Sequence, residues 1–363
     1  MTFQHLYLIG VCSLLTSLSS QSATQSGFQW IEASTLRVEG QGWSDTLAPF
    51  DRLPKKAKAS VRGPVWSLSQ NSAGILVRFK TNATEIHARW SLTNKNLAMP
   101  HMPATGVSGL DLYVHHQKRW RWLGVGMPRK FPNNETALVR GLTKKTREYL
   151  LYLPLYNGVS KVSIGIPKAA SIKAGKPPKQ QLPLVFYGTS ITQGGCASRP
   201  GMVHTAILGR QLDCEVINLG FSGNGTMDMS MATLLTEIKA SAYIIDCLPN
   251  MQANGVRART KPLVKALRKS HPNTPIILVE DRSYANAFLI TSKAQRSQQS
   301  RLQLRKAFQD LQSSGMRRLY YLPGSDLLGG DGEGTVDSSH PTDLGFTRQA
   351  DAFAKLLAPL LSR

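Results

Sequence analysis

The second half of the chain alternates strand-like apolar runs with helix-like segments, and this alternation is what most constrains the fold. The strand-like runs lie at residues 184–187, 215–221, 242–248, 275–279 and 319–322, and the helix-like segments at residues 202–212, 229–238, 256–270, 298–313 and 346–361. Five βα repeats with short junctions predict a parallel sheet covered on both faces, with right-handed crossovers. Ligands of such sheets bind at the carboxyl ends of the strands, so we expect the chemistry just after each strand.

The first half has a different pattern. Short runs of alternating polarity, separated by Gly, Pro and Asn, lie at residues 75–81, 85–91, 111–115, 119–123 and 159–166. Alternation with this spacing predicts antiparallel strands in a β-sandwich, here residues 24–167. A lysine-rich segment with Pro177-Pro178 predicts a linker at residues 168–182 before the α/β domain, residues 183–363. Trp120 and Trp122 share one face of a strand, and we interpret them as core tryptophans in preference to a stacking platform for sugar or base.

The N-terminus has the outline of a secretory signal peptide, residues 1–23. An apolar stretch from Leu6 to Leu18 runs into small and polar residues, although no Lys or Arg precedes it. We therefore expect a periplasmic or secreted protein, with a buried N-terminal helix as the alternative. Cleavage would remove Cys12 and leave three cysteines, an odd number that favours buried thiols over a disulfide framework.

The charge is strongly basic, with a formal net charge of +22. Residues 24–180 hold 24 basic and 8 acidic residues, whereas residues 181–363 hold 20 and 14. Such an excess favours an anionic partner: nucleic acid, anionic lipid or an acidic polymer. No Cys/His finger, heptad-linked basic region or aromatic RNA-binding motif accompanies the charge, which disfavours nucleic acid. Beyond the first 23 residues no apolar run is long enough to span a bilayer, which disfavours integral membrane association.

Polar motifs follow four of the predicted strands. They are Gly188 to Thr192 after the first strand, Asn218 to Gly225 after the second, Asp246 to Asn250 after the third, and Asp337 to Pro341 between the fifth strand and the last helix. Each motif alone is weak, because serines and glycines often serve only to make turns. Their joint order at successive carboxyl ends is much harder to obtain by chance.

These motifs resemble those of the SGNH (GDSL-type) esterases and acylhydrolases over residues 183–363. The resemblance implies a flavodoxin-like, three-layer α/β domain. It places the nucleophile at Ser190, the oxyanion-hole residues at Gly223 and Asn250, and the Asp-x-x-His motif at Asp337 and His340. Two departures stand out. Thr189 replaces the commoner Asp, and the third motif lacks the usual glycine before its asparagine.

The first half resembles a known companion of these enzymes. Residues 109–113 read Gly-Leu-Asp-Leu-Tyr and follow His101-Met102-Pro103. Gly-x-Asp-Leu-Tyr is the motif of a β-sandwich, jelly-roll-like domain that precedes a subset of SGNH hydrolases. Together the two halves resemble that two-domain family.

The residues themselves support serine chemistry. Ser190 needs an adjacent base, which His340 can provide, and Asp337 can fix the imidazole tautomer. The backbone N–H groups of Ser190 and Gly223 with the Asn250 amide could hold the oxyanion formed on an ester carbonyl. This mechanism needs neither a metal ion nor an organic cofactor.

Two other groups compete for a catalytic or metal-binding role. Ser222 lies in a sequence one residue short of a Gly-x-Ser-x-Gly elbow, and we interpret it as a turn residue beside the site. Asp331, Glu333 and Asp337 lie among glycines but fail the spacing of a calcium loop.

The remaining candidates are weaker. Cys196 and Cys247 are interpreted as buried packing residues. His115 and His116 point to opposite faces of a strand and cannot bind one metal together. Glu280-Asp281 follow the fourth strand and could touch the substrate.

The sequence therefore predicts a serine esterase that removes O-acetyl or other short acyl groups from carbohydrate, with an acidic polysaccharide among the candidate substrates. A lysophospholipase or short-chain lipase is the enzymatic alternative. A catalytically silent carbohydrate-binding protein is the alternative from another class, and a nucleic-acid binder is third.

Overall fold

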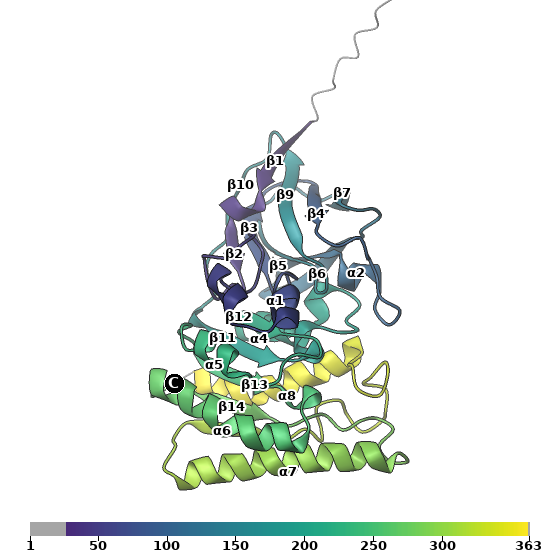
Figure 1. The fold of residues 1–363 in the computed structure, drawn as a ribbon. Coiled ribbons are helices and arrows are strands. Elements are labelled where there is room, and N and C mark those ends of the chain that lie inside the picture. Colours follow the sequence, from purple (N-terminus) through teal and green to yellow (C-terminus); the bar gives the residue numbers. More distant parts are fainter. Residues whose placement is uncertain (1–26, 362–363) are drawn as a thin grey trace, which may run out of the picture.

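The computed structural model describes residues 27–361 as antiparallel sheets followed by a parallel α/β domain (Figure 1). The predicted signal peptide, residues 1–23, lies outside the described residues. The predicted fold class is confirmed in both halves of the chain. Within residues 27–361 no helix is long and apolar enough to cross a membrane.

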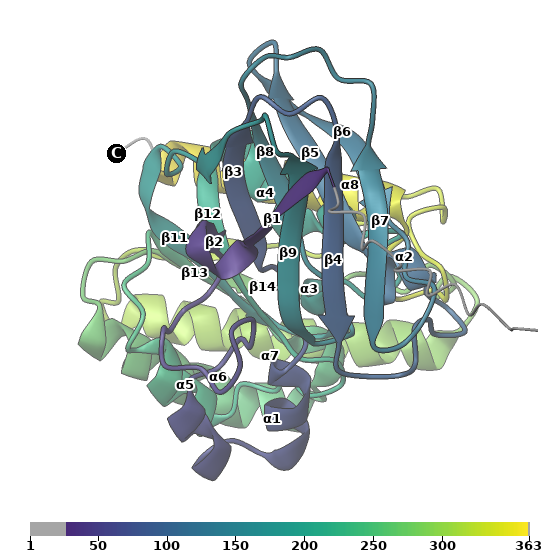
Figure 2. The same ribbon diagram turned by 90° about the horizontal axis from the view of Figure 1, so that it is seen from above.

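Two antiparallel sheets build the N-terminal domain. One has the order β1-β9-β4-β7, and the other has the order β10-β3-β8-β5-β6 with β2 paired to β3. The strands are β1 Phe28–Glu32, β2 Arg37–Glu39, β3 Leu76–Thr81, β4 Ile86–Leu92, β5 Leu110–His116, β6 Arg119–Gly126, β7 Asn133–Val139, β8 Arg147–Tyr152, β9 Val159–Pro167 and β10 Ile172–Ala174. The two sheets face each other (Figure 2). Alternate side chains of their strands meet between them, where Phe79, Trp90, Leu112, Tyr149 and Ile164 share one core.

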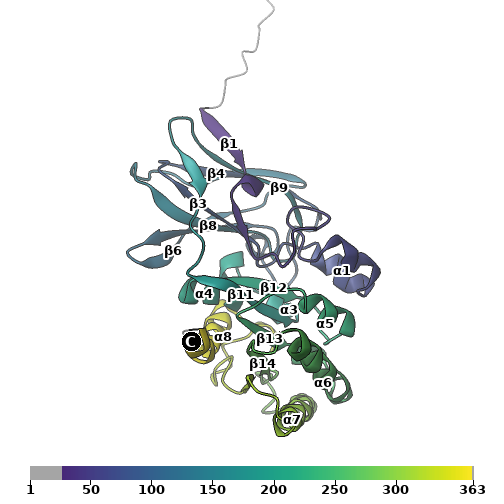
Figure 3. The same cartoon turned by 90° about the vertical axis from the view of Figure 1, so that its left-hand side faces the viewer.

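The second domain is a five-stranded parallel sheet with the order β12-β11-β13-β14-β15. Its strands are β11 Gln180–Gly188, β12 Cys214–Gly220, β13 Ala242–Asp246, β14 Ile276–Val279 and β15 Leu319–Leu322. Its helices are α3 Ser190–Gln193, α4 His204–Leu212, α5 Met229–Leu235, α6 Ala253–Ser270, α7 Thr291–Ser313 and α8 Asp343–Leu361. Helices α4 and α8 pack on one face, and α5, α6 and α7 pack on the other (Figure 3). This strand order is that of flavodoxin-like sheets.

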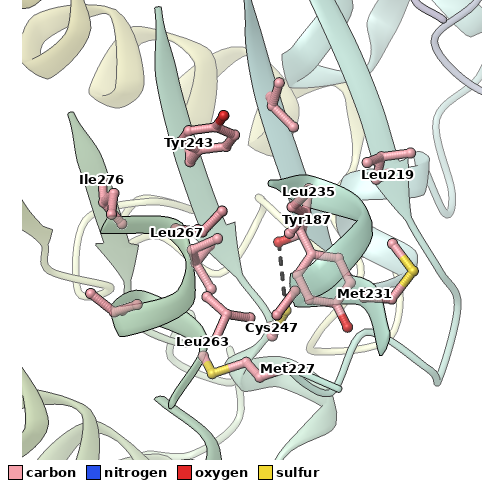
Figure 4. Close-up of a cluster of buried hydrophobic side chains, with 14 of the residues drawn as sticks. Tyr187, Leu219, Met227, Met231, Leu235, Tyr243, Cys247, Leu263, Leu267 and Ile276 are labelled. Carbon is pink, nitrogen blue, oxygen red and sulfur yellow. Dashed lines mark hydrogen bonds between the residues drawn. The ribbon is translucent and has the colours of Figure 1, made fainter. Parts of the chain in front are cut away.

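The strands of the parallel sheet are held in place by a buried core on both faces. Every residue of β13 is buried, as expected for a central strand covered on both faces. On one face Tyr243 and Tyr187 pack with Leu263 and Leu267 of α6 (Figure 4). Burying a leucine side chain is worth about 1.5–3 kcal/mol relative to leaving it exposed. The loops at the carboxyl edge of the sheet therefore start from well-fixed strand ends.

The Gly-x-Asp-Leu-Tyr motif joins the two domains. The buried carboxylate of Asp111 accepts hydrogen bonds from the Arg199 guanidinium and the Gly201 N–H, both at 2.8 Å. The Tyr113 hydroxyl accepts a third from Arg199 at 2.6 Å. Burial raises the pKa of Asp111, and the charge of Arg199 opposes this rise. Position 201 requires glycine, because a Cβ there would lie 2.3 Å from the Tyr113 ring.

The interpretation as core residues is wrong for Trp122, whereas Trp120 is half-buried and packs against a small buried cluster of Tyr113, Leu150, Tyr152 and Ala206. Trp122 is 49% exposed and donates its indole N–H to Asp111 at 2.9 Å, while Trp120 is half-buried against the ring of His115. The reason is that this face of β6 turns toward the α/β domain, where the Arg199 guanidinium lies 5.2 Å from the Trp122 ring. The sandwich core is filled from the opposite face of the sheet.

The predicted linker contains regular structure. Strand β10 lies within residues 168–182 and pairs antiparallel with β3. The Lys176 N–H then donates to the Glu148 carboxylate at 3.0 Å, and β11 begins at Gln180. Most of this segment therefore runs along the sandwich before it enters the parallel sheet.

Candidate active site

Ser190 stands where β11 ends and the short helix α3 begins. The preceding Thr189 caps the helix, and its hydroxyl accepts the Ile191 N–H at 3.3 Å. A threonine can make this cap as an aspartate can, since each offers a side-chain oxygen to the first turn. The departure from the commoner Asp therefore leaves Ser190 at the start of the helix.

The structure brings Ser190, His340 and Asp337 together. Ser190 Oγ lies 2.8 Å from His340 Nε2, and His340 Nδ1 lies 2.7 Å from Asp337 Oδ2. The other carboxylate oxygen of Asp337 accepts the backbone N–H groups of His340 at 2.8 Å and Ser339 at 3.0 Å. Partial burial raises the pKa of Asp337, but the hydrogen bonds from His340 and Ser339 outweigh it and leave the pKa below its ordinary value. Asp337 is thus held as a carboxylate facing the imidazole.

The structure brings Gly223 and Asn250 into contact. The Asn250 amide fits its surroundings when its oxygen accepts the N–H groups of residues 223, 224 and 225 at 3.3, 3.0 and 3.2 Å. The N–H groups of Asn224 and Gly225 also donate to the Phe221 carbonyl at 2.8 and 3.0 Å, so this loop is a tight turn that closes around the Asn250 side chain. The amide NH₂ then occupies the branch that faces hydrogen-bond acceptors. Gly223 has φ +67°, the left-handed conformation that favours glycine.

A buried ion pair supports the nucleophile helix from behind. Thr192 donates its hydroxyl to Asp246 Oδ2 at 3.1 Å, and Arg282 pairs with both oxygens of that carboxylate. Gln349 of α8 accepts a hydrogen bond from Arg282 Nε at 2.8 Å. Asp246 and Arg282 are both buried. The third parallel strand, the loop after the fourth and the last helix are therefore linked to the turn that carries Ser190.

The sandwich domain also reaches the site, which the sequence did not predict. The Tyr156 hydroxyl donates to the backbone carbonyl of Ser190 at 3.2 Å. The ring of His101 lies 6.1 Å from that of His340. Arg62 donates to the Asn224 side chain at 2.8 Å and to its carbonyl at 2.9 Å, and so holds the loop that carries Gly223. These residues lie between regular strands, where the local sequence pattern does not predict a contact with the other domain.

Ser222 lies beside the site as a turn residue. Its N–H donates to the side-chain oxygen of Gln193 at 3.0 Å, and Gln193 in turn donates to the Leu155 carbonyl of the sandwich at 3.1 Å. The imidazole of His340 contacts Ser190 instead.

The hypothesis that Glu280-Asp281 touch substrate is wrong. Both side chains are buried. Glu280 accepts from Tyr321 and from the Gly324 N–H at 2.9 Å, and Asp281 pairs with Arg296 at 2.8 Å. This ion pair and these hydrogen bonds attach α7 and the loop after β15 to the end of β14.

The remaining candidate residues are buried or paired with other side chains. Cys196 and Cys247 are buried free thiols, as interpreted, and burial raises the pKa of both. The Asp331 carboxylate is engaged by Arg348 at 2.7 and 2.6 Å. Across residues 27–361 no three His, Cys, Asp or Glu side chains gather into a group that could hold a metal ion.

Comparison with known proteins identifies both domains. The model of the GDSL-like lipase/acylhydrolase family matches residues 181–358, and the model of the N-terminal domain of SGNH-hydrolase-type esterases, named GxDLY, matches residues 28–172. A search of curated proteins finds no match.

Solved structures extend this result. A GDSL-like lipase from Bacteroides ovatus is 33% identical with a TM-score of 0.88, over 92% of this chain and 98% of that one. A salicylyl-acyltransferase from a tetracycline biosynthetic pathway is 18% identical with a TM-score of 0.74, over 92% and 98%. A family two carbohydrate esterase from Clostridium thermocellum, in complex with cellohexaose, is 15% identical with a TM-score of 0.58, over 80% and 93%. The last two likenesses concern the fold alone.

The fold and these matches define a carboxylic ester hydrolase of the SGNH type. The chain belongs to the GDSL-like lipase/acylhydrolase family and carries a GxDLY domain on the N-terminal side of the hydrolase domain.

Proposed function

We propose that the protein is a serine esterase that removes O-acetyl and other short acyl groups from carbohydrate. The observation that carries the proposal is the hydrogen-bonded series Ser190 Oγ, His340 and Asp337, with heavy-atom distances of 2.8 and 2.7 Å. Such a series lets the imidazole take the serine proton while the carboxylate stabilises the imidazolium.

The first half of the reaction forms an acyl-enzyme. Ser190 Oγ attacks the ester carbonyl carbon, and its proton passes to His340 Nε2. The carbonyl oxygen becomes an oxyanion, which the Ser190 N–H and the Asn250 NH₂ stabilise. The Gly223 N–H joins them when it exchanges the Asn250 oxygen, 3.3 Å away, for the oxyanion. Collapse of this intermediate breaks the bond to the alcohol oxygen, which leaves with the proton from His340.

The second half returns the enzyme to its starting state. A water molecule gives its proton to His340 Nε2 as its oxygen attacks the acyl carbon. The second oxyanion uses the same donors, and its collapse releases the carboxylic acid while the proton returns to Ser190 Oγ. Asp337 stays ionised throughout, because its pKa lies below the ordinary carboxyl range.

An open site supports a polymeric substrate. The side chains of His340 and Asp337 are 26% and 43% exposed, so an ester borne on a long chain can approach without first entering a tunnel. His101 and Tyr156 of the sandwich add polar groups to the rim. The fold of the cellohexaose-bound carbohydrate esterase is consistent with this substrate class.

A short-chain lipase or lysophospholipase is the second candidate, and one observation favours it. Phe288 and Leu289 are 81% and 79% exposed in the loop after β14, shortly before α7 begins at Thr291. That loop contacts the catalytic loop, since the Ala285 N–H donates to the Ser338 carbonyl at 3.0 Å. Apolar side chains at this place could contact a lipid surface.

A substrate panel separates the two candidates. Acetate release would be measured from acetylated xylan and from an acetylated polyuronate, and fatty-acid release from lysophosphatidylcholine, with p-nitrophenyl acetate as the general ester and Ser190→Ala as the blank. We expect the acetylated polysaccharides to be the better substrates. Faster turnover of lysophosphatidylcholine would replace the proposal with the lipase candidate, and no turnover of p-nitrophenyl acetate would refute serine esterase activity.

We also propose export to the periplasm or the exterior, on the basis of residues 1–23. Cell fractionation of the full chain, with N-terminal sequencing of the mature protein, tests it. A cytoplasmic protein that retains Met1 would contradict export.

A further inference from the structure

A groove with a basic lining lies at the junction of the two domains, away from Ser190. It has a volume of about 720 Å³. Its walls come from the β5–β6 hairpin, the segment before β11 and the C-terminal end of α4, and include His115, Lys118, Arg119, Trp120, Lys176 and Lys179. The groove is thus built by segments that are far apart in the sequence.

The charge in this groove is largely uncompensated. Lys118, Arg119, Lys176 and Lys179 are exposed, and none of them forms an ion pair within residues 27–361. Two carboxylates also line the groove. Glu148 is engaged by Arg78 and Lys80 at 3.9 and 3.6 Å, and Asp213 sets one further negative charge against the four cations. Four cationic side chains that converge without partners attract an anion, because a groove with low-dielectric walls focuses their field.

The groove lies at the edge of the parallel sheet opposite to the active site. Lys176 and Lys179 precede the first residue of β11, whereas Ser190 follows its last residue. Nine residues of strand separate these two ends, which corresponds to roughly 25–30 Å. The β5–β6 hairpin runs along the same direction, with Asp111 at the interface and Lys118 in the turn by the groove. A ligand in the groove therefore leaves the catalytic groups free.

We propose that this groove is a second binding site for an acidic carbohydrate chain, whose carboxylate or sulfate groups pair with these four cations. The choice of carbohydrate over another polyanion rests on the proposed function. The indole of Trp120 adds an apolar wall against which a sugar ring can pack. A polymer held there keeps its other acyl groups at high local concentration near Ser190, so the groove retains the substrate between turnovers.

Binding without hydrolysis is the test. The intact mature protein would be titrated with unacylated polygalacturonate at low and high salt. The groove variant carries Lys176→Glu and Lys179→Glu. The matched control carries Lys265→Glu and Lys269→Glu, two exposed lysines of α6 on the other side of the parallel sheet, and it changes the net charge by the same amount.

We expect the groove variant to lose about tenfold or more in affinity at low salt and the control to lose little. High salt should remove the difference, because the Debye length falls to about 3 Å at 1 M. Both variants should hydrolyse p-nitrophenyl acetate at the wild-type rate. Equal losses in the two variants, or none in the groove variant, would overturn the proposal. Tighter binding of single-stranded DNA than of polygalacturonate, with the same dependence on Lys176 and Lys179, would overturn the assignment to carbohydrate.

This test is independent of the esterase assay. A protein that binds polygalacturonate through the groove but releases no acetate from polysaccharides would refute the proposed substrate and leave the binding site in place. A protein that deacetylates polysaccharides but does not bind polygalacturonate through the groove would refute the binding site and leave the proposed substrate in place.

Discussion

The α/β domain and the sandwich contribute to one site in different ways. Ser190, His340 and Asp337 come from the parallel domain, and the His340 imidazole is hydrogen-bonded to Ser190 on one side and to Asp337 on the other. The sandwich supplies Tyr156 and Arg62, which contact the backbone of the nucleophile turn and of the Gly223 loop. One domain therefore carries the reacting atoms and the other fixes the backbone that presents them. Mutations in the α/β domain should therefore lower kcat far more than mutations in the sandwich, whose effect on kcat comes only through the position of the backbone.

The largest effect is expected from the nucleophile. Ser190→Ala should lower kcat by about 10⁴-fold or more, since loss of a serine nucleophile removes the covalent pathway. Ser222→Ala serves as the control from the neighbouring turn and should keep most of the activity, because the imidazole of His340 contacts Ser190 and the backbone N–H of Ser222 that holds the turn is retained. Hydrolysis of p-nitrophenyl acetate measures both, with circular dichroism to verify folding. Similar, modest losses of kcat in both variants would show that Ser190 is not the nucleophile.

Asp337→Asn should come next, with a loss of about 10³- to 10⁴-fold in kcat, because an amide no longer fixes the imidazole tautomer. In the wild type, hydrogen bonds keep the pKa of Asp337 below its ordinary value, so its support is present at neutral pH and is lost only as the pH falls through that lowered pKa. The Asp337 carboxyl should therefore add no proton of its own to the acid limb of the rate profile at mildly acidic pH. A two-proton acid limb at mildly acidic pH would contradict this assignment.

Asn250→Ala should lower kcat by about 10²- to 10³-fold with a smaller change in KM, as expected for a donor used mainly in the transition state. The same change frees the N–H groups of residues 223–225 from the side-chain oxygen that they share. Steady-state kinetics would separate the two parameters. A rise in KM at constant kcat would assign Asn250 to substrate binding alone.

The difference between the domains also explains what could be read from the sequence. Ser190, Gly223 and Asn250 each follow a parallel strand, so strand prediction alone brings them to one edge. Contacts between the domains have no such periodic signal. Trp122 illustrates this limit, because its alternation on β6 indicates a face of the sheet but not what covers that face. Glu280-Asp281 illustrate another, since their position after β14 was predicted but their buried partners lie on α7 and near β15.

Arg62→Ala tests whether the sandwich acts on catalysis through the Gly223 loop. Arg62 holds Asn224 with two hydrogen bonds and also pairs with Asp228 at 2.9 Å, and each such contact is worth about 1 kcal/mol net, less where water screens it. We expect kcat to fall by about tenfold with little change in KM or in thermal stability. Lys58→Ala is the matched control, an exposed cation of the same domain without an ion pair in the described part of the chain. Equal activities of the two variants would limit the sandwich to a passive role.

The smallest effect is expected at the hydroxyl of Tyr156, and it is the sharpest test of the division between the domains. Tyr156→Phe keeps the ring and removes one hydrogen bond to the Ser190 carbonyl. A neutral hydrogen bond contributes about 0.5–1.5 kcal/mol, so kcat/KM should fall by about two- to tenfold. A catalytic hydroxyl would behave differently, since loss of a proton-transfer group costs about 10²-fold or more and alters the pH profile. A small decrease in kcat/KM with an unchanged pH profile would mean that the sandwich positions the nucleophile turn. A large decrease with a shifted pH profile would instead place a reacting group in the sandwich, so that the reacting atoms would no longer come from the α/β domain alone.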